Sequence, residues 1–361
     1  MSSAPTIEVS SRGQAKRPHK WRRRILWFLG ILLFLEIALR LFGYGSYVIY
    51  RPDERLLWVP IPGNSKVTEI NHEAENINSQ GFRYKETLTL QHPGIYRIFT
   101  FGDSVTMGWA VPDDATYSAQ LEKMLNAQGC PGTKFQVISA GVNAYPNSLV
   151  AERLTKVLDD GYQPDAVVFA YSANTGFEGI PDLQGAARKT FLRRVEYKSI
   201  ARRSALYNFV IEGVLRQLVY YRMRELLMLG TWNTAKSSAD LPAEHFIADL
   251  DRSKAAAEAH HSQLILLLLG SKGEPYPAHP YQAAMLEYGK TRNLPLVNII
   301  DLMKSQNQDA VFEDHVHPSP KGHAMIAEQL LATVHSLPSY AAACSAGPSN
   351  SATSAAAGAS R

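Results

Sequence analysis

Short runs of apolar residues alternate with amphipathic segments over most of this chain, and this alternation restricts the possible fold more than any other feature. Each run is five to seven residues long and apolar on both faces, as strands of a parallel sheet covered on both sides must be. The runs are Tyr96–Phe101, Phe135–Ala140, Ala166–Tyr171, Gln263–Leu269 and Leu296–Ile300. The helix-like segments are Thr116–Gln128, Asn147–Asp160, Ala243–His261, Pro280–Asn293 and Pro320–His335. We therefore expect a three-layer α/β/α sandwich with a mostly parallel five-stranded sheet.

The composition supports one large domain with short flanking regions. Of 361 residues, 45% are hydrophobic and 19% charged, which is enough to bury a sizeable core. We place the domain at residues 94–338, after a connecting region at 45–93 that has few helix signals and several turn formers. The Ala/Ser-rich tail at 339–361 has no hydrophobic periodicity and is expected to be disordered. Cys130 and Cys344 allow at most one disulfide, so the cysteine count leaves export undecided.

The N-terminal segment has the form of a membrane anchor. A basic arm at residues 1–24 precedes a hydrophobic stretch at 25–44 that is interrupted only by Glu36 and Arg40. About twenty residues at helical rise cross a hydrocarbon core, so we expect a single transmembrane helix. Because Lys/Arg-rich flanks stay cytoplasmic, the N-terminus should be cytoplasmic and the domain periplasmic or extracellular. A cleaved signal peptide is the alternative, although no small-residue cleavage site follows Leu35.

One segment interrupts the alternation. About seventy residues separate the third apolar run from the helix at Ala243, and we place a helical insertion at about 176–242. Residues 188–224 contain ten basic side chains and only two acids, interleaved with apolar and aromatic residues. This pattern is typical either of solvated helices packed on the core, or of a lid or a surface resting against anionic headgroups.

The stretch Phe-Gly-Asp-Ser, which ends in Ser104, closes the first apolar run. A strand that ends in glycine, aspartate and serine forms either a plain turn or a site where the serine is presented for nucleophilic attack. Active sites of open parallel sheets gather at the carboxyl ends of the strands, and Ser104 follows such an end directly.

A serine nucleophile needs a base, and Asp314-x-x-His317 lies near the end of the domain. Pro318 disfavours helix at His317, so the pair should lie in a loop, where the aspartate orients one imidazole nitrogen and the other faces the serine. His315 and His323 also make a metal site conceivable. His315 and His317 in an extended loop would point in opposite directions, however, so we expect no metal.

Oxyanion donors are available after the second and third runs, in ISAGVNAYPN and FAYSANTGF. Backbone N–H groups and the Asn174 side chain stand at strand ends there, although Asn174 and Asn143 can equally be turn formers. The chain contains no nucleic-acid motif, no glycine-rich phosphate loop and no cofactor fingerprint. We therefore expect no cofactor and no nucleic-acid partner.

Taken together, these residues resemble the SGNH, or GDSL-like, hydrolases, which are named for a serine, glycine, asparagine and histidine in separate sequence blocks. Residues 102–104 resemble the first block, the segment with Asn174 the third, and the Asp-x-x-His element the fifth. Their order and context agree across residues 96–337. The stretch NSQGFRYKE at 78–86 resembles the corresponding part of membrane-anchored bacterial members.

The resemblance implies an oxyanion hole built from the Ser104 N–H, a block-two backbone N–H and the Asn174 side chain. Gly141 is the visible block-two glycine, but the family's glycine often lies three residues later, at Ala144. Alanine can serve there if its φ and ψ are ordinary. Residues 172–175 read Ser-Ala-Asn-Thr where the family has Gly-x-Asn-Asp, so the aspartate is absent.

The resemblance also implies a serine esterase that works through an acyl-Ser104 intermediate, with His317 as base and Asp314 orienting it. Esters of small acyl groups on glycans are the expected substrates, reached from a position on the lipid bilayer. An O-acyltransferase acting on envelope glycans and a non-catalytic scaffold of the same fold are the alternatives.

Overall fold

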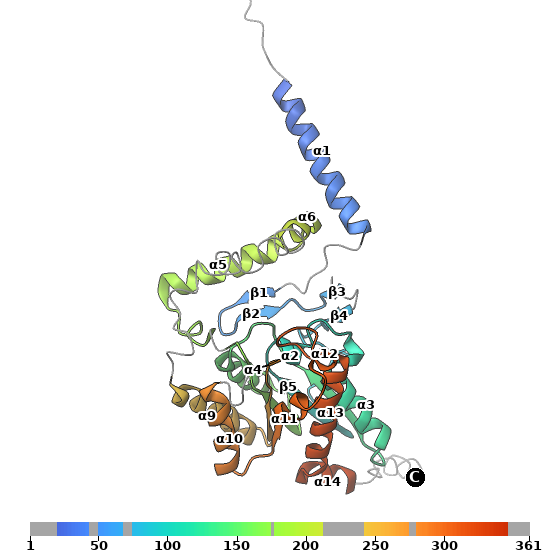
Figure 1. Ribbon diagram of the computed structural model, residues 1–361, viewed down its shortest axis with the longest axis vertical. Helices are drawn as coiled ribbons and strands as arrows, with labels where there is room; N and C mark the ends of the chain where they lie inside the picture. The colour runs from blue at the N-terminus through green and yellow to red at the C-terminus, as the bar shows by residue number, and fades with distance from the viewer. Residues whose placement is uncertain are drawn as a thin grey trace, which may run out of the picture.

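The computed structural model shows a parallel sheet with helices packed on both faces (Figure 1). It describes residues 20–42, 50–67, 74–174, 177–211, 242–273 and 279–345. Five strands form the sheet in the order β6-β5-β7-β8-β9, and each neighbouring pair is parallel. The predicted α/β/α sandwich is confirmed.

The five strands occupy the five apolar runs, and each begins and ends within two residues of its expected bounds. They are β5 (Ile95–Phe101), β6 (Lys134–Ser139), β7 (Ala166–Ala170), β8 (Gln263–Leu268) and β9 (Leu296–Asn298). Both faces of a strand are apolar because each face enters a core. In β5, Phe99 and Phe101 pack into one core, whereas Tyr96 and Ile98 pack into the core on the opposite face.

The five predicted helices form the two outer layers. The first core is covered by α4 (Asn147–Asp159), α9 (Ala243–Ala259) and α10 (Pro280–Thr291), and the second by α3 (Tyr117–Gln128) and α13 (Pro320–His335). Short helical turns connect these elements: α2 (Ser104–Met107), η1 (Asp113–Ala115), α11 (Ile300–Lys304) and α12 (Gln308–Val311). Because β5 is an interior strand of the sheet, with β6 on one side and β7 on the other, the loop after it lies between the two layers.

The connecting region forms two small antiparallel pairs rather than irregular chain. β1 (Tyr50–Asp53) pairs with β2 (Leu57–Pro60), and β3 (Ser65–Val67) pairs with β4 (Ala74–Asn76). Trp58 in β2 is buried against the Tyr145 ring, with centroids 5.1 Å apart. The connecting region therefore contributes to the first core.

The N-terminal helix α1 (Lys20–Leu41) differs from the transmembrane helix expected at 25–44. No helix in the described ranges is both long enough and apolar enough to span a bilayer. The expectation is therefore not confirmed. The physical reason is that α1 takes in the basic residues from Lys20 to Arg24 at its start and Glu36 and Arg40 near its end.

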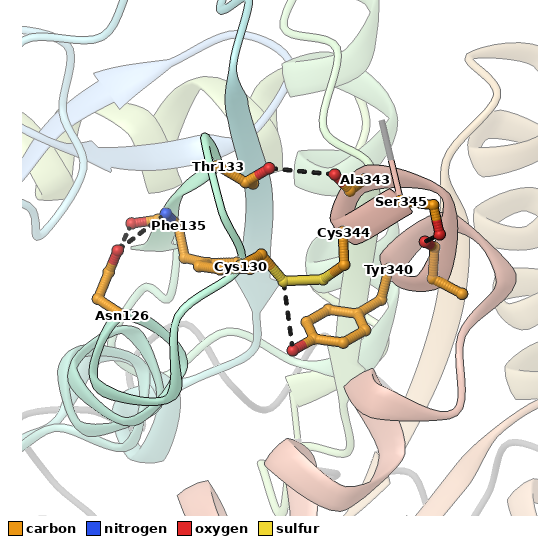
Figure 2. The surroundings of a disulfide bond; sticks show 9 residues. Asn126, Cys130, Thr133, Phe135, Tyr340, Ala343, Cys344 and Ser345 are labelled. Carbon is orange, nitrogen blue, oxygen red and sulfur yellow. Dashed lines mark hydrogen bonds between the residues drawn. A yellow bond between two sulfur atoms is a disulfide. The ribbon is translucent and has the colours of Figure 1, made fainter. Parts of the chain in front are cut away.

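The C-terminal segment is more ordered than we expected. Residues 339–345 belong to helix α14 (Pro338–Ser345), which corrects the prediction of disorder there, and residues 346–361 lie outside the described residues. Cys344 on this helix forms a disulfide with Cys130, 214 residues earlier (Figure 2). The Tyr340 ring stacks on Phe135. The low-complexity composition concealed this anchoring, because the contacts come from residues distant in sequence.

The described part of the insertion, residues 177–211, contains α5 (Gly185–Ala201) and α6 (Ala205–Asn208). Both lie between α1 and the sheet domain (Figure 1). Residues 212–241 of the predicted insertion, like the basic arm up to residue 19, lie outside the described residues.

Candidate active site

Ser104 is presented at the carboxyl end of β5 by a sharp turn. Asp103 caps α2, its Oδ1 accepting the Val105 N–H at 2.9 Å, and Ser104 is the first residue of that helix. Gly102 is required in the turn, because a Cβ there would stand 2.0 Å from Thr106 Oγ1. The strand therefore ends at "FGDS" because the chain must turn tightly enough to place Ser104 at the sheet edge.

Asp314 and His317 lie in a loop, as predicted. The loop is closed at its base by the antiparallel bridge between Phe312 and Pro318, and by a hydrogen bond from the Glu313 N–H to the His317 carbonyl at 2.8 Å. Asp314 Oδ1 accepts the backbone N–H of His317, also at 2.8 Å. These bonds fix the loop so that both side chains face the turn at Ser104.

The three side chains form an unbroken hydrogen-bonded chain. His317 Nε2 lies 2.8 Å from Ser104 Oγ, and His317 Nδ1 lies 2.8 Å from Asp314 Oδ2. An Asp314 carboxylate requires the imidazole proton on Nδ1, which leaves Nε2 free to accept the serine proton. The structure thus brings together the three residues that the sequence singled out.

The carboxylate of Asp314 remains ionised in this setting. Burial raises the pKa of Asp314, but hydrogen bonds and charge from His317, with the N–H groups of His317 and Val316, outweigh it, so the pKa lies well below its ordinary value. The ionised form is the one that holds the Nδ1 proton and stabilises an imidazolium.

Two of the expected oxyanion donors lie beside the nucleophile. The Ser104 N–H is the first of α2 and makes no hydrogen bond to any described residue. Asn174 Nδ2 donates to Asp103 Oδ2 at 2.8 Å. The Tyr145 carbonyl and Ser172 Oγ lie 3.4 and 3.2 Å from the same nitrogen, so these three acceptors hold the amide beside the nucleophile turn.

The block-two residues have different structural roles. A Cβ on Gly141 would stand 2.4 Å from the Met107 nitrogen, so this glycine permits the close approach of β6 to α2. Ala144 is in the left-handed region, with φ of 64°. Its backbone is therefore not ordinary, which was our condition for alanine at this position. It instead adopts the conformation for which glycine is preferred.

Ser172 supports the asparagine, and sequence reasoning missed it. Its Oγ lies 2.9 Å from Asp103 Oδ2 and 2.7 Å from the Tyr145 carbonyl, and it accepts the Asn174 N–H at 3.0 Å. Ser172 stands where the family pattern has glycine, and this departure was the signal that could have identified it. Asp103 is fully buried, which raises its pKa, while the Val105 N–H and the Ser172 hydroxyl oppose that shift.

A second buried layer stands behind Ser172. Asn147 Oδ1 accepts the Ser172 N–H at 2.9 Å, and Asn147 Nδ2 donates to Glu178 Oε1 at 2.8 Å. The N–H groups of Asn147 and Ser148 also donate to the Glu178 carboxylate, at the start of α4. The first residues of the insertion thus cap the helix that supports the oxyanion side of the site.

Arg83, from the stretch at 78–86, supports the nucleophile turn. Its guanidinium donates to the carbonyls of Met107 and Val111 at 2.7 Å, and it pairs with Asp113. It therefore satisfies the Met107 carbonyl at the end of α2 and the Val111 carbonyl in the turn that follows.

Of the two further histidines near the loop, His323 makes a structural contact. His323 is fully buried, its Nδ1 accepts the Tyr117 N–H at 3.1 Å, and burial lowers its pKa to about 3. The described part of the chain contains no group of three or more His, Cys, Asp or Glu side chains arranged to hold a metal ion.

A sequence model of the GDSL-like Lipase/Acylhydrolase family matches residues 100–325, which is more than half of the chain. The chain therefore belongs to this family, and it is a GDSL-type hydrolase. The resemblance inferred from the sequence is confirmed at the level of the family. No curated relative matches the chain.

Solved structures of similar fold include the following three. Esterase EstA from Pseudoalteromonas sp. is 14% identical, with 66% of this chain and 97% of that chain covered and a TM-score of 0.40. The lipase/acylhydrolase from Enterococcus faecalis is 17% identical, with 66% and 94% covered and a TM-score of 0.42. A G-D-S-L family member from Veillonella parvula is 11% identical, with 67% and 100% covered and a TM-score of 0.42. The family assignment rests on the sequence match alone.

Proposed function

We propose that this chain is a serine esterase that hydrolyses its substrate through an acyl-enzyme on Ser104. The observation that carries the proposal is the hydrogen-bonded chain from Ser104 Oγ through His317 to Asp314, with both bonds at 2.8 Å. A serine hydroxyl is a weak nucleophile until a base within hydrogen-bond reach removes its proton, and this geometry provides that base.

The reaction runs in two halves. Ser104 Oγ attacks the acyl carbon while its proton passes to His317 Nε2, and the oxyanion is held by the Ser104 N–H and the Asn174 amide. The bond to the leaving alcohol breaks, and the alcohol takes the proton from His317. Water then attacks the acyl-serine with His317 again as base, releasing the acid and restoring the serine.

Small acyl groups on a glycan are the substrate class we favour. The Trp109 ring packs on the His317 imidazole, with centroids 4.4 Å apart, and is only half-buried. The Trp109 N–H donates to the Ser104 carbonyl at 2.9 Å, which fixes this residue to the nucleophile turn. A partly exposed indole beside the nucleophile suits contact with a sugar ring.

The test is covalent labelling of the detergent-solubilised full chain with a fluorophosphonate, followed by intact mass. We expect a single adduct in the parent chain and none in Ser104→Ala. The exposed serine variant Ser305→Ala is the matched control and should label fully. Absence of an adduct on the folded parent chain would overturn the esterase proposal.

Substrate class is tested on the same preparation. O-acetylated oligosaccharides and p-nitrophenyl esters of increasing chain length are compared by kcat/KM, and we expect acetyl to exceed octanoyl. A preference for long chains would refute the small-acyl assignment. Acyl transfer that outruns hydrolysis when free sugars are added would instead identify an O-acyltransferase.

We further propose that α1 holds the protein at a lipid bilayer. Its apolar side chains are exposed around the helix, and none is buried against the domain. From Ile25 to Leu35 the helix is apolar all round, and such a surface needs a non-aqueous surrounding. Basic residues at its start match the cytoplasmic flank of an anchor. An N-terminus in the cytoplasm, with the domain on the periplasmic or extracellular side, stays a prediction.

The disulfide between Cys130 and Cys344 supports the extracytoplasmic side. Such bonds persist in oxidising compartments and are rare where thiols are kept reduced. Protease added to intact spheroplasts should degrade the domain, and thiol trapping should find both cysteines oxidised. A protected domain with two free thiols would contradict this location.

A further inference from the structure

The exposed apolar side chains of the described chain are unevenly distributed. Outside residues 20–42, five large apolar side chains are exposed, and three of them, Tyr197, Ile200 and Val210, lie within residues 185–211. Tyr197 and Ile200 are exposed by 71% and 62%. Exposed apolar groups gathered on one segment mark a contact surface more often than scattered ones do.

The helix α5 carries basic residues on the same face. It has five Lys or Arg residues and one acid, Glu196. Lys189, Arg193, Tyr197 and Ile200 are exposed and are spaced by four, four and three residues, which aligns them along one side of a helix. Two cations beside an aromatic and an aliphatic side chain can contact anionic headgroups together, although the acid Glu196 lies on this side as well.

The opposite face of α5 is docked on the domain. Phe191 packs 5.8 Å from the Trp58 ring, Leu192 and Val195 lie against the first core, and Arg188 donates to the carbonyl of Glu54. These contacts determine which side of α5 faces away from the domain.

The C-terminal end of α5 is joined to α1. The Glu36 carboxylate accepts the N–H groups of Ala205 and Leu206 at 2.9 Å and the Ser204 hydroxyl at 2.8 Å. Arg40 donates to the Arg203 carbonyl at 2.6 Å. The last turns of α1 and the start of α6 are thus one unit, and α5 leads from it across the domain (Figure 1).

We propose that the face formed by Lys189, Arg193, Tyr197 and Ile200 lies in the headgroup layer of the membrane that holds α1 and binds anionic lipid there. This proposal rests on the proposed location of α1, because the hydrogen bonds to Glu36 and Arg40 keep α5 close to that helix. The cations pair with lipid phosphates, and the phenol ring and the isoleucine enter the boundary between headgroups and acyl chains.

The experiment uses the full chain in nanodiscs of phosphatidylcholine, with or without about one-third phosphatidylglycerol. An environment-sensitive dye is attached to a Tyr197→Cys variant, whose native cysteines are both in the disulfide. We expect a blue shift with phosphatidylglycerol that is lost at high salt. The double variant Lys189→Gln/Arg193→Gln should weaken this contact about 25-fold, at roughly fivefold per basic residue.

The matched control removes the same charge elsewhere. Lys123→Gln/Lys290→Gln, on the exposed faces of α3 and α10, should leave the dye signal unchanged. An equal dye signal with and without anionic lipid would overturn the proposal. So would a control variant that loses as much lipid contact as Lys189→Gln/Arg193→Gln does. Failure of the chain to enter nanodiscs would refute the location of α1 instead, and ester hydrolysis on the same samples reports separately on the esterase proposal.

Discussion

The helices α4 and α5 pack against the same apolar core but bury very different fractions of their side chains in it. α4 buries eight of its 13 side chains, whereas α5 buries two of 17, Phe191 and Ser199. Burial of that extent fixes α4 by contacts within the chain. The side chains on the exposed face of α5 are not buried by the domain, so a surface that covers them must come from outside it.

The proposed catalytic residues lie in regions that, like α4, are fixed by contacts within the chain. Ser104, Asn174 and their supporting groups are held by hydrogen bonds between described elements of the sheet domain. We therefore expect variants there to alter turnover without altering lipid contact, and variants on α5 to do the reverse. The predictions below test this division.

The largest effect is expected for Asp314→Asn. An amide cannot hold the Nδ1 proton of His317 as the carboxylate does, and the wrong tautomer should lower kcat about 10⁴-fold. Asp314 is 40% exposed in its side chain, so the fold should survive. Steady-state kinetics in detergent measures kcat, and the dye contact of α5 should be unchanged. A variant with near-parental kcat would rule out this triad.

The next effect separates the oxyanion donor from its support. Asn174→Ala should lower kcat by about 10²–10³, the usual result of losing one donor. Ser172→Ala leaves the amide in place but removes the hydroxyl beside Asp103, so a smaller loss of about tenfold, mainly in kcat, is expected. Equal losses in the two variants, or a change in KM alone, would contradict a positioning role for Ser172.

A pH-dependent effect on stability is expected from Asp249, on α9. Burial raises its pKa to about 7, Arg252 opposes this, and Glu178 adds to it. The folded pKa lies above the unfolded value near 4, so this contribution to stability is full below about pH 4 and is lost as the pH rises towards 7. The melting temperature of Asp249→Asn minus that of the parent chain should therefore be larger at pH 8 than at pH 4. Calorimetry that finds the same difference at both pH values would refute it.

The smallest effect concerns Ala144. Its left-handed backbone costs an L-residue about 1–2 kcal/mol, whereas glycine costs chain entropy of about 0.4–1 kcal/mol. Ala144→Gly should therefore keep activity and leave the free energy of unfolding unchanged or higher by up to about 1 kcal/mol. The same substitution inside α4, Ala151→Gly, should cost about 1–2 kcal/mol, because it loses helix propensity and the burial of a core methyl group. Denaturant titration compares the two, and equal losses would exclude strain at Ala144.

The sequence by itself determines the strands, the helices and the three residues of the proposed catalytic site. Apolar runs fix β5 to β9 within two residues because period and burial are local properties of the sequence. Ser104 and the loop with His317 could be predicted because each follows a recognisable strand or turn signal.

Only the tertiary structure decided the contacts that join distant residues. The disulfide from Cys130 to Cys344, the support of Asn174 by Ser172 and the docking of α6 on Glu36 each link segments far apart in the chain or depend on exact loop shape. Composition also misled at the C-terminal end, where α14 is ordered despite its small residues. Local patterns encode which face of an element is buried, whereas the partner on that face is set by how the sheet brings the elements together.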